Sequence, residues 1–178
     1  VRHMRSLDYY ELPNLINELF ELKTTSSLAL IFKISTAARA SEVIGAQWNE
    51  FDLTNKIWTI PASRMKKRRE HVVPLNDLAC MIINNMPKHN SSEFIFLNNS
   101  KKSHIDNNKM NVTLKTYLPE FHKKTVPHGF RSSFRNWAEE NYNFSRRAVE
   151  LCLSHTNKNK VENAYLRSNL FAKRQQIM

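Results

Sequence analysis

The stretch Leu28-Ala-Leu-Ile-Phe-Lys-Ile-Ser-Thr-Ala-Ala38 is apolar around almost its whole circumference when it is wound as an α-helix. A surface helix would show one apolar and one polar face, so this segment predicts a buried helix. Arg39 follows directly, at a place where a charge is costly unless it is paired. Ser41 then starts a second, short helix that we expect to reach about Gln47.

Further along the chain, the hydrophobic pattern changes from helical to strand-like. Lys56–Pro61 reads Lys-Ile-Trp-Thr-Ile-Pro and Glu70–Pro74 reads Glu-His-Val-Val-Pro, both rich in β-branched and aromatic residues. Such short segments predict strands. The charged run Arg64-Met-Lys-Lys-Arg-Arg69 lies between them. We therefore expect a small antiparallel sheet with a basic turn.

The rest of the pattern is mainly helical. Asp8 can cap a first helix that reaches about Glu21, and the four residues from Thr24 to Ser27 are typical of a loop and cap. Of the ambiguous residues 87–108, only Phe94–Leu97 looks packed. The other expected helices are Asn76–Met86 and Ser145–Leu153, each starting at its cap, with Asn108–Tyr117, His128–Asn141, Asn159–Leu166 and Leu170–Ile177. The predicted fold class is mainly α with a small antiparallel β-sheet (α+β).

Composition narrows the function. The chain has 178 residues and a net charge of +11, which favours a polyanionic partner, although a merely solvated basic surface fits the charge as well. Gly45 and Gly129 are the only glycines, so a glycine-rich phosphate loop is excluded and side chains must hold any phosphate.

Cysteine usage and hydropathy indicate the compartment. Cys80 and Cys152 lack metal-site spacing, which favours a reduced cytosolic protein without disulfides or zinc. No apolar run approaches the ~20 residues of a membrane span, and no signal peptide is visible. Val1–Met4 looks like a cloning remnant, so we expect one domain over residues 5–178, excised from a longer protein.

Several basic side chains occur where they can bind a phosphate. Arg39 alone fits a helix-terminal arginine paired with Glu42 better, but a buried helix can also hold a guanidinium rigidly toward a phosphate. His128 and Arg131 share one face in the first turn of a helix, where backbone donors favour an anion. His155 ends an apolar helix, where the dipole alone favours a histidine.

Taken in order, these residues resemble the catalytic domain of a tyrosine recombinase, in the prophage and genomic-island integrase branch. The resemblance extends from about Leu28 to the C-terminus. It rests on four segments, which are Thr-Ala-Ala-Arg-Ala-Ser-Glu (36–42), His-Gly-Phe-Arg (128–131), Leu-Ser-His (153–155) and Ala-Tyr-Leu-Arg-Ser (164–168). Ser154 departs from the pattern, since the family often has glycine there.

The resemblance implies a role for each residue. Arg39 and Arg131 would be the catalytic arginines, Glu42 a supporting acid, and His128 and His155 hydrogen-bonding or proton-transfer residues. Tyr165, ten residues after His155, would be the nucleophile. Lys66 on the basic turn would be the general acid, with Lys67 as the alternative. We expect Arg64, Lys67, Arg68 and Arg69 to bind DNA, and neither a metal nor another cofactor to be needed.

The resemblance also implies an activity and partners. The chain would cleave and rejoin DNA strands through a 3′-phosphotyrosyl intermediate, for integration and excision of a mobile element. Expected partners are double-stranded attachment-site DNA, other integrase protomers in a synaptic tetramer, a host architectural protein and an excisionase, with no membrane. We expect the protein to act in the bacterial cytoplasm, at the nucleoid. We also expect the longer protein to carry core-binding and arm-binding domains that are absent from this chain.

Two other functions remain open at this stage. A type IB topoisomerase-like strand transferase uses the same chemistry but rejoins the same strand. A non-catalytic basic DNA-binding module would share only the charge. The family's C-terminal tail packs on a neighbouring protomer, whereas in a lone chain Leu170–Met178 can fold back on its own body or pair with a second copy.

Overall fold

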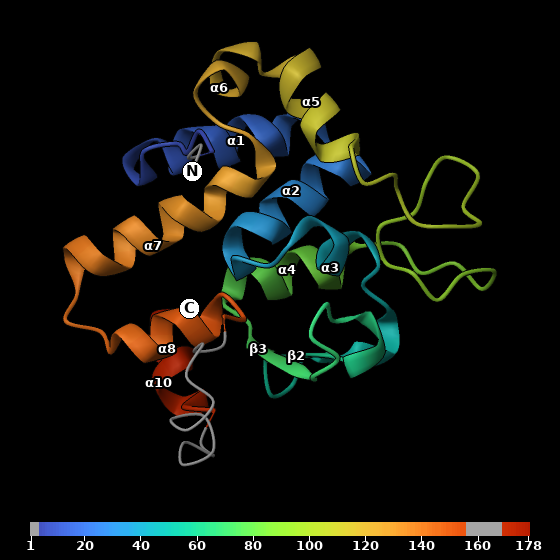
Figure 1. The fold of residues 1–178 in the computed structure, drawn as a ribbon. Helices are drawn as coiled ribbons and strands as arrows, with labels where there is room; N and C mark the ends of the chain where they lie inside the picture. The colour runs from blue at the N-terminus through green and yellow to red at the C-terminus, as the bar shows by residue number, and fades with distance from the viewer. Residues whose placement is uncertain (1–3, 156–168) are drawn as a thin grey trace.

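The computed structural model describes residues 4–155 and 169–178, and a buried helix crosses its centre (Figure 1). This helix, α2 (Thr25–Thr36), begins with a reciprocal cap, because Thr24 accepts from the Ser27 backbone while Ser27 accepts from the Thr24 backbone. The expected loop at Thr24–Ser27 is thus the N-cap and first turn of α2. Its middle is almost fully buried, which confirms the prediction from the apolar stretch.

Helices on several sides cover α2. It packs against α1 (Leu12–Leu22), α4 (Asp77–Asn85) and α5 (Lys109–Tyr117), and α5 packs in turn against α6 (Pro119–Lys124). Asp8 caps a short 3-10 turn, η1 (Tyr9–Glu11), that leads into α1. The helix α6 was not predicted, because six residues with three basic ones at the end carry no apolar stripe.

A three-stranded antiparallel sheet lies beside α3 (Ala40–Ile44) and α4 (Figure 1). Its order is β1 (Phe51–Asp52), β2 (Ile57–Ile60), β3 (His71–Pro74), with Trp58 opposite Val73. The predicted hairpin is confirmed, while β1 is too short to show a period. The 3-10 turns η2 (Trp48–Glu50) and η3 (Ala62–Arg64) flank the sheet segments.

Between α4 and α5 the chain extends to one side of the molecule without regular structure (Figure 1). Isolated bridges pair Gln47 with Phe94 and Leu97 with His104. Ile95, Phe96 and Leu97 are buried, so Phe94–Leu97 is the packed element that the sequence indicated.

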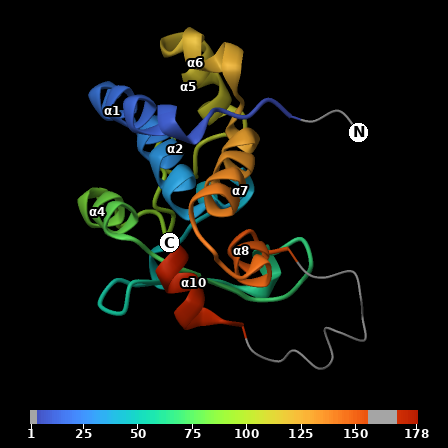
Figure 2. The same ribbon diagram turned by 90° about the vertical axis from the view of Figure 1, so that its left-hand side faces the viewer.

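A second, smaller core forms where α7 (Phe130–Asn141), α8 (Arg146–Cys152) and α10 (Phe171–Ile177) meet. Figures 1 and 2 both place α8 and α10 side by side. The helix α7 follows a 3-10 turn, η4 (Pro127–Gly129). Ser145 precedes α8 as expected, but its side chain makes no capping hydrogen bond. The helix expected at 159–166 lies outside the described residues.

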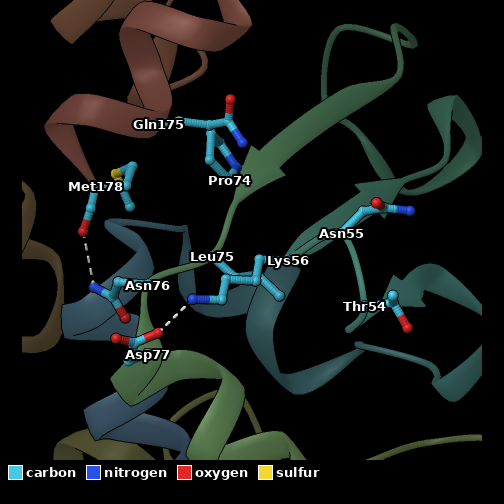
Figure 3. A pocket seen from close by; sticks show the side chains of 9 residues that line it. All are labelled: Thr54, Asn55, Lys56, Pro74, Leu75, Asn76, Asp77, Gln175 and Met178. Atoms are coloured by element: carbon cyan, nitrogen blue, oxygen red, sulfur yellow. Dashed lines mark hydrogen bonds and ion pairs between the residues drawn. The ribbon is translucent and has the colours of Figure 1, made fainter.

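The C-terminal helix α10 folds back on its own chain. Arg174 donates from Nη2 to the Val72 carbonyl oxygen of β3, and the Asn76 side-chain amide donates to the Met178 carbonyl oxygen at 3.1 Å. Figure 3 shows the contact between Asn76 and Met178 beside an open cavity of about 530 Å³. Lys56 pairs with Asp77 at 2.6 Å in the same cavity. None of the candidate catalytic residues within the described ranges lines this cavity. In this single chain the tail lies against its own body.

Candidate active site

Arg39 begins α3 immediately after the chain leaves α2. Ala37 ends α2 in the left-handed region at φ 51°, and this turn brings Arg39 to the N-cap position. Arg39 Nη1 donates to Glu42 Oε1 at 2.7 Å, while its backbone N–H donates to Glu42 Oε2 at 2.8 Å. Glu42 is buried and Arg39 keeps 28% of its side chain exposed. The ion pair therefore fixes the guanidinium without burying it.

Arg131 joins three separate segments through one buried guanidinium. It is 5% exposed on α7. Nη1 donates to the Ala37 carbonyl oxygen at 2.5 Å, and Nη2 donates to that of Leu153 at 2.5 Å. Burial, with repulsion from Arg39, lowers the pKa of Arg131 to about 10, so it stays charged at neutral pH.

The two arginines meet at one backbone oxygen. Arg39 Nη2 lies 3.5 Å from the Leu153 carbonyl oxygen, which also accepts from Arg131, and 3.5 Å from that of Ser154. The segment Leu153–Ser154 therefore lies between two guanidinium groups that come from α3 and α7. Two cations so close to one oxygen form a strongly electropositive point, suited to an anionic ligand.

His155 is held from both sides of its ring. Its Nε2 is 3.2 Å from Arg131 Nη2, and its Nδ1 is 2.7 Å from Glu150 Oε2. An arginine only donates, so Nε2 is the acceptor and Nδ1 carries the proton. Glu150 also pairs with Arg135 at 3.3 Å. The sequence analysis missed Glu150 and Arg135, since a glutamate five residues before a histidine is no recognised signal.

His128 lies in η4, just before α7, rather than in the first turn of α7 as expected. It shares the electropositive surroundings of the arginines. Partial burial is the largest cause that lowers the pKa of His128. The charges of Lys33, Arg131, Arg39 and His155 lower this pKa further. His128 is therefore within the electrostatic influence of both arginines and of His155.

His71 is a further histidine near the arginines that the sequence analysis missed. It starts β3, directly after the basic turn, and is half-buried. Burial is the largest cause that lowers the pKa of His71 to about 4, followed by Arg174, with Arg39 and Arg131 contributing. His71 is therefore neutral at physiological pH. Only its place beside the basic turn hinted at this position.

The basic turn divides into a buried and an exposed part. Arg64 Nε donates to Glu50 Oε1 at 2.7 Å and Nη2 to Glu50 Oε2 at 2.8 Å, which makes Arg64 a structural arginine behind the turn. The four residues Lys66–Arg69 are exposed at the end of the β2–β3 hairpin. The structure thus separates Arg64 from Lys66, Lys67, Arg68 and Arg69. Tyr165 lies outside the described residues.

Neither a metal cluster nor a membrane span is found within residues 4–155 and 169–178. Those residues contain no group of three His, Cys, Asp or Glu side chains placed to hold a metal ion. In the same part of the chain, no helix is long and apolar enough to cross a membrane.

Comparison with known proteins identifies the family. The model of the phage integrase family matches residues 5–170. The prophage integrase IntA of Escherichia coli K12 is 33% identical over 181 residues, which cover 99% of this chain and 43% of that protein. This chain therefore spans less than half the length of that relative.

Solved structures give the same fold. XerA recombinase aligns with a TM-score of 0.71 and 16% identity, over 99% of this chain and 66% of that one. A lambda integrase dimer bound to a COC′ core site aligns with a TM-score of 0.62 and 15% identity, over 95% and 61%. The chain has the catalytic-domain fold of the tyrosine recombinases. It belongs to the phage integrase family.

Proposed function

We propose that this chain is the catalytic domain of a site-specific DNA recombinase, which cleaves and rejoins strands through a tyrosine. The observation that carries the proposal is the convergence of Arg39 and Arg131 on the Leu153 carbonyl oxygen, beside His155. A DNA phosphate supplies the anion that this arrangement favours. The arginines neutralise the charge that grows on phosphorus as it becomes pentacoordinate.

The covalent step balances without a metal or ATP. The Tyr165 hydroxyl loses its proton and attacks phosphorus, a 3′-phosphotyrosyl bond forms, and the bond to the 5′ oxygen breaks. Lys66 protonates that leaving oxygen as general acid. A 5′ hydroxyl of another strand later reverses the attack. Because one phosphodiester is exchanged for another, the bond energy is conserved.

The histidines position the phosphate by hydrogen bonding and take part in transfer of the proton that the nucleophile loses. His155 has its proton on Nδ1, held by Glu150, and its Nε2 accepts from Arg131. When a phosphate draws Arg131, Nε2 becomes free to accept a proton. Partial burial and then the surrounding cations lower the pKa of His128, which favours its neutral form, and it acts as a hydrogen-bonding residue.

The exposed turn provides the DNA contacts outside the active site. Lys67, Arg68 and Arg69 lie on the hairpin end with Lys66, and contacts of this kind position DNA without reading its bases. Arg64 is left out of this surface because the Glu50 carboxylate accepts hydrogen bonds from both Nε and Nη2 of its guanidinium. With a net charge of +11, binding should weaken steeply as salt rises.

We place the reaction in the bacterial cytoplasm, at attachment sites of a mobile element. Other integrase protomers in a synaptic tetramer, a host architectural protein and an excisionase complete the proposed assembly. Domains that clamp the opposite face of the DNA are proposed for the longer protein. This chain alone should bind DNA weakly and with little sequence preference.

A suicide DNA substrate in EDTA tests the proposal. The nicked substrate loses a short strand after cleavage, so a covalent protein–DNA adduct should accumulate on a denaturing gel. Salt-sensitive binding without an adduct would favour the non-catalytic module. An adduct that rejoins the original strand when that strand is added back, but never a 5′-hydroxyl strand of a second duplex, would favour the topoisomerase-like alternative. If EDTA prevented the adduct and Mg²⁺ restored it, the metal-free mechanism would be contradicted.

A further inference from the structure

Lys33 is a buried amine that the proposed mechanism does not use. It lies in the middle of α2 with 1% of its surface exposed. Within the described part of the chain, its Nζ has no hydrogen-bond partner. A buried amine without a partner is costly, and a charged one is costlier still. Methionine or leucine would fill the same volume at no such cost, which directs attention to the amine.

The position of Lys33 links it to the arginines. It precedes Ala37 by one helical turn, and the Ala37 carbonyl oxygen accepts the hydrogen bond from Arg131. Three charged or titratable groups of neighbouring elements interact with it electrostatically: Arg131 from α7, Glu42 from α3 and His128 from η4. Lys33 is thus a buried residue one helical turn from the carbonyl oxygen that Arg131 contacts.

These surroundings leave the amine poised between its two protonation states. Burial first, and then repulsion from Arg131, lowers the pKa of Lys33 from 10.5 to about 7, while Glu42 raises it. At pH 8 most of the Lys33 amine is therefore neutral when no anion occupies the site. A second cation near Arg131 becomes more favourable when a negative charge binds to the site.

We propose that Lys33 is a positioning residue of the active site, which takes up a proton from solvent when a DNA phosphate binds to Arg39 and Arg131. This inference rests on the proposed function for the nature of the anion. The proton passes from water or buffer to Nζ, and no covalent bond of DNA or protein changes in this step. The new positive charge near Arg131 stabilises the bound phosphate electrostatically, without contacting the DNA.

The linkage is reciprocal. If phosphate binding raises the proton affinity of Lys33, protonation of Lys33 raises the affinity for phosphate by the same factor. The effect grows in the transition state, where the phosphorane carries more negative charge than the substrate. Cleavage should therefore slow as pH rises through the pKa of Lys33 in the DNA complex.

Proton uptake on binding tests the inference directly. The chain with Tyr165→Phe, which keeps DNA uncleaved, is titrated with duplex DNA at pH 8 in two buffers of different ionisation enthalpy. We expect a substantial fraction of one proton to be taken up, and almost all of this uptake to vanish when Lys33→Met is added. Lys115→Met, the same change at an exposed lysine of α5, should keep it. Equal uptake with and without Lys33→Met would overturn the inference.

The pH dependence of cleavage gives a second readout, which a merely structural role would not move. The unmodified chain should lose single-turnover rate as pH rises through the pKa of Lys33 in the DNA complex, which lies above the value of about 7 in the free chain. Lys33→Met should bind DNA more weakly at pH 7, by roughly 5- to 150-fold for a coupling of usual size, and should cleave it more slowly. It should lack the alkaline decline that Lys33 causes. An unchanged decline in Lys33→Met would contradict the proposal.

A measurement on the unsubstituted side chain covers the case in which Lys33→Met does not fold. In a Tyr165→Phe chain labelled with ¹³C at lysine Cε, the Lys33 resonance should titrate at higher pH with DNA than without. An equal midpoint would overturn the inference. The two proposals fail separately: no adduct with a suicide substrate contradicts the recombinase, whereas an adduct with no proton linkage contradicts only the role of Lys33.

Discussion

Arg39 and Arg131 donate to the same acceptor, the carbonyl oxygen of Leu153, from distances of 3.5 and 2.5 Å. They are far apart in the sequence, and each is anchored separately, Arg39 by Glu42 and Arg131 by the Ala37 carbonyl oxygen. Their shared orientation therefore follows from the packing of α2, α7 and α8. A phosphate has several acceptor oxygens and a full negative charge, so it suits this pair better than one carbonyl does.

Arg131→Lys should abolish most strand cleavage although the positive charge remains. A lysine cannot make the two divergent hydrogen bonds to Ala37 and Leu153 while also contacting a phosphate. Loss of one transition-state contact typically costs roughly 10²–10³ in rate. Single-turnover cleavage of a suicide substrate measures this, with Arg146→Lys as the matched change at an exposed arginine of α8. Near-normal cleavage by Arg131→Lys would argue against direct phosphate contact.

Substitutions on the hairpin should separate catalysis from binding. Lys66→Ala should slow cleavage much more than it weakens binding, because the leaving 5′ oxygen loses its proton donor. A bridging 5′-phosphorothiolate should restore the rate, since a thiolate leaves without a proton. Lys67→Ala should mainly lower affinity. Rescue of Lys67→Ala but not of Lys66→Ala would assign the general acid to Lys67.

Ser154→Gly should stabilise the protein. Ser154 has φ 52°, in the left-handed region, where a side chain costs roughly 1–2 kcal/mol and glycine costs little. We expect the free energy of unfolding in urea to rise by about 1 kcal/mol. Ser132→Gly, an exposed site within α7, should lower it by about as much. A destabilised Ser154→Gly chain would show that the Ser154 side chain makes a contact worth more than the backbone strain.

The stability of the protein should depend on pH through Lys33. Burial and Arg131 lower the pKa of Lys33 from 10.5 to about 7, so the unfolded chain binds one more proton than the folded chain between those values. The destabilisation is complete below pH 7 and shrinks as pH rises, by about 1.4 kcal/mol per pH unit at most. Urea unfolding at pH 7, 8 and 9 should show the stability advantage of Lys33→Met falling. A constant advantage would mean that Lys33 stays charged in the folded state.

The fold followed from the sequence where a pattern was strong. The apolar run at 28–38 predicted α2, and the β-branched segments predicted the β2–β3 hairpin. The strand β1 and the helix α6 are too short to show a period, so packing decides them. The exposed and buried parts of the basic run look alike in sequence. Only the fold reveals that Glu50 engages Arg64.

The candidate site was predicted as a set of residues but not as a geometry. The order of Arg39, His128, Arg131 and His155 pointed to phosphate chemistry through a resemblance. Their joint contact runs through the backbone of Leu153, and no residue identity encodes a backbone acceptor. Lys33 was visible as a lysine in an apolar helix, yet its proposed role depends on the nearby charge of Arg131, which only the fold reveals. The catalytic roles themselves stay predictions.

Identification of the nucleophile tests the central claim most directly. The covalent adduct from a suicide substrate is digested, and the peptide that carries the nucleotide is sequenced by mass spectrometry. We predict a phosphotyrosyl bond at Tyr165, complete loss of adduct with retained DNA binding in Tyr165→Phe, and a normal adduct in Tyr117→Phe, an exposed tyrosine on α5. An adduct on any other residue, or one that persists in Tyr165→Phe, would contradict the account.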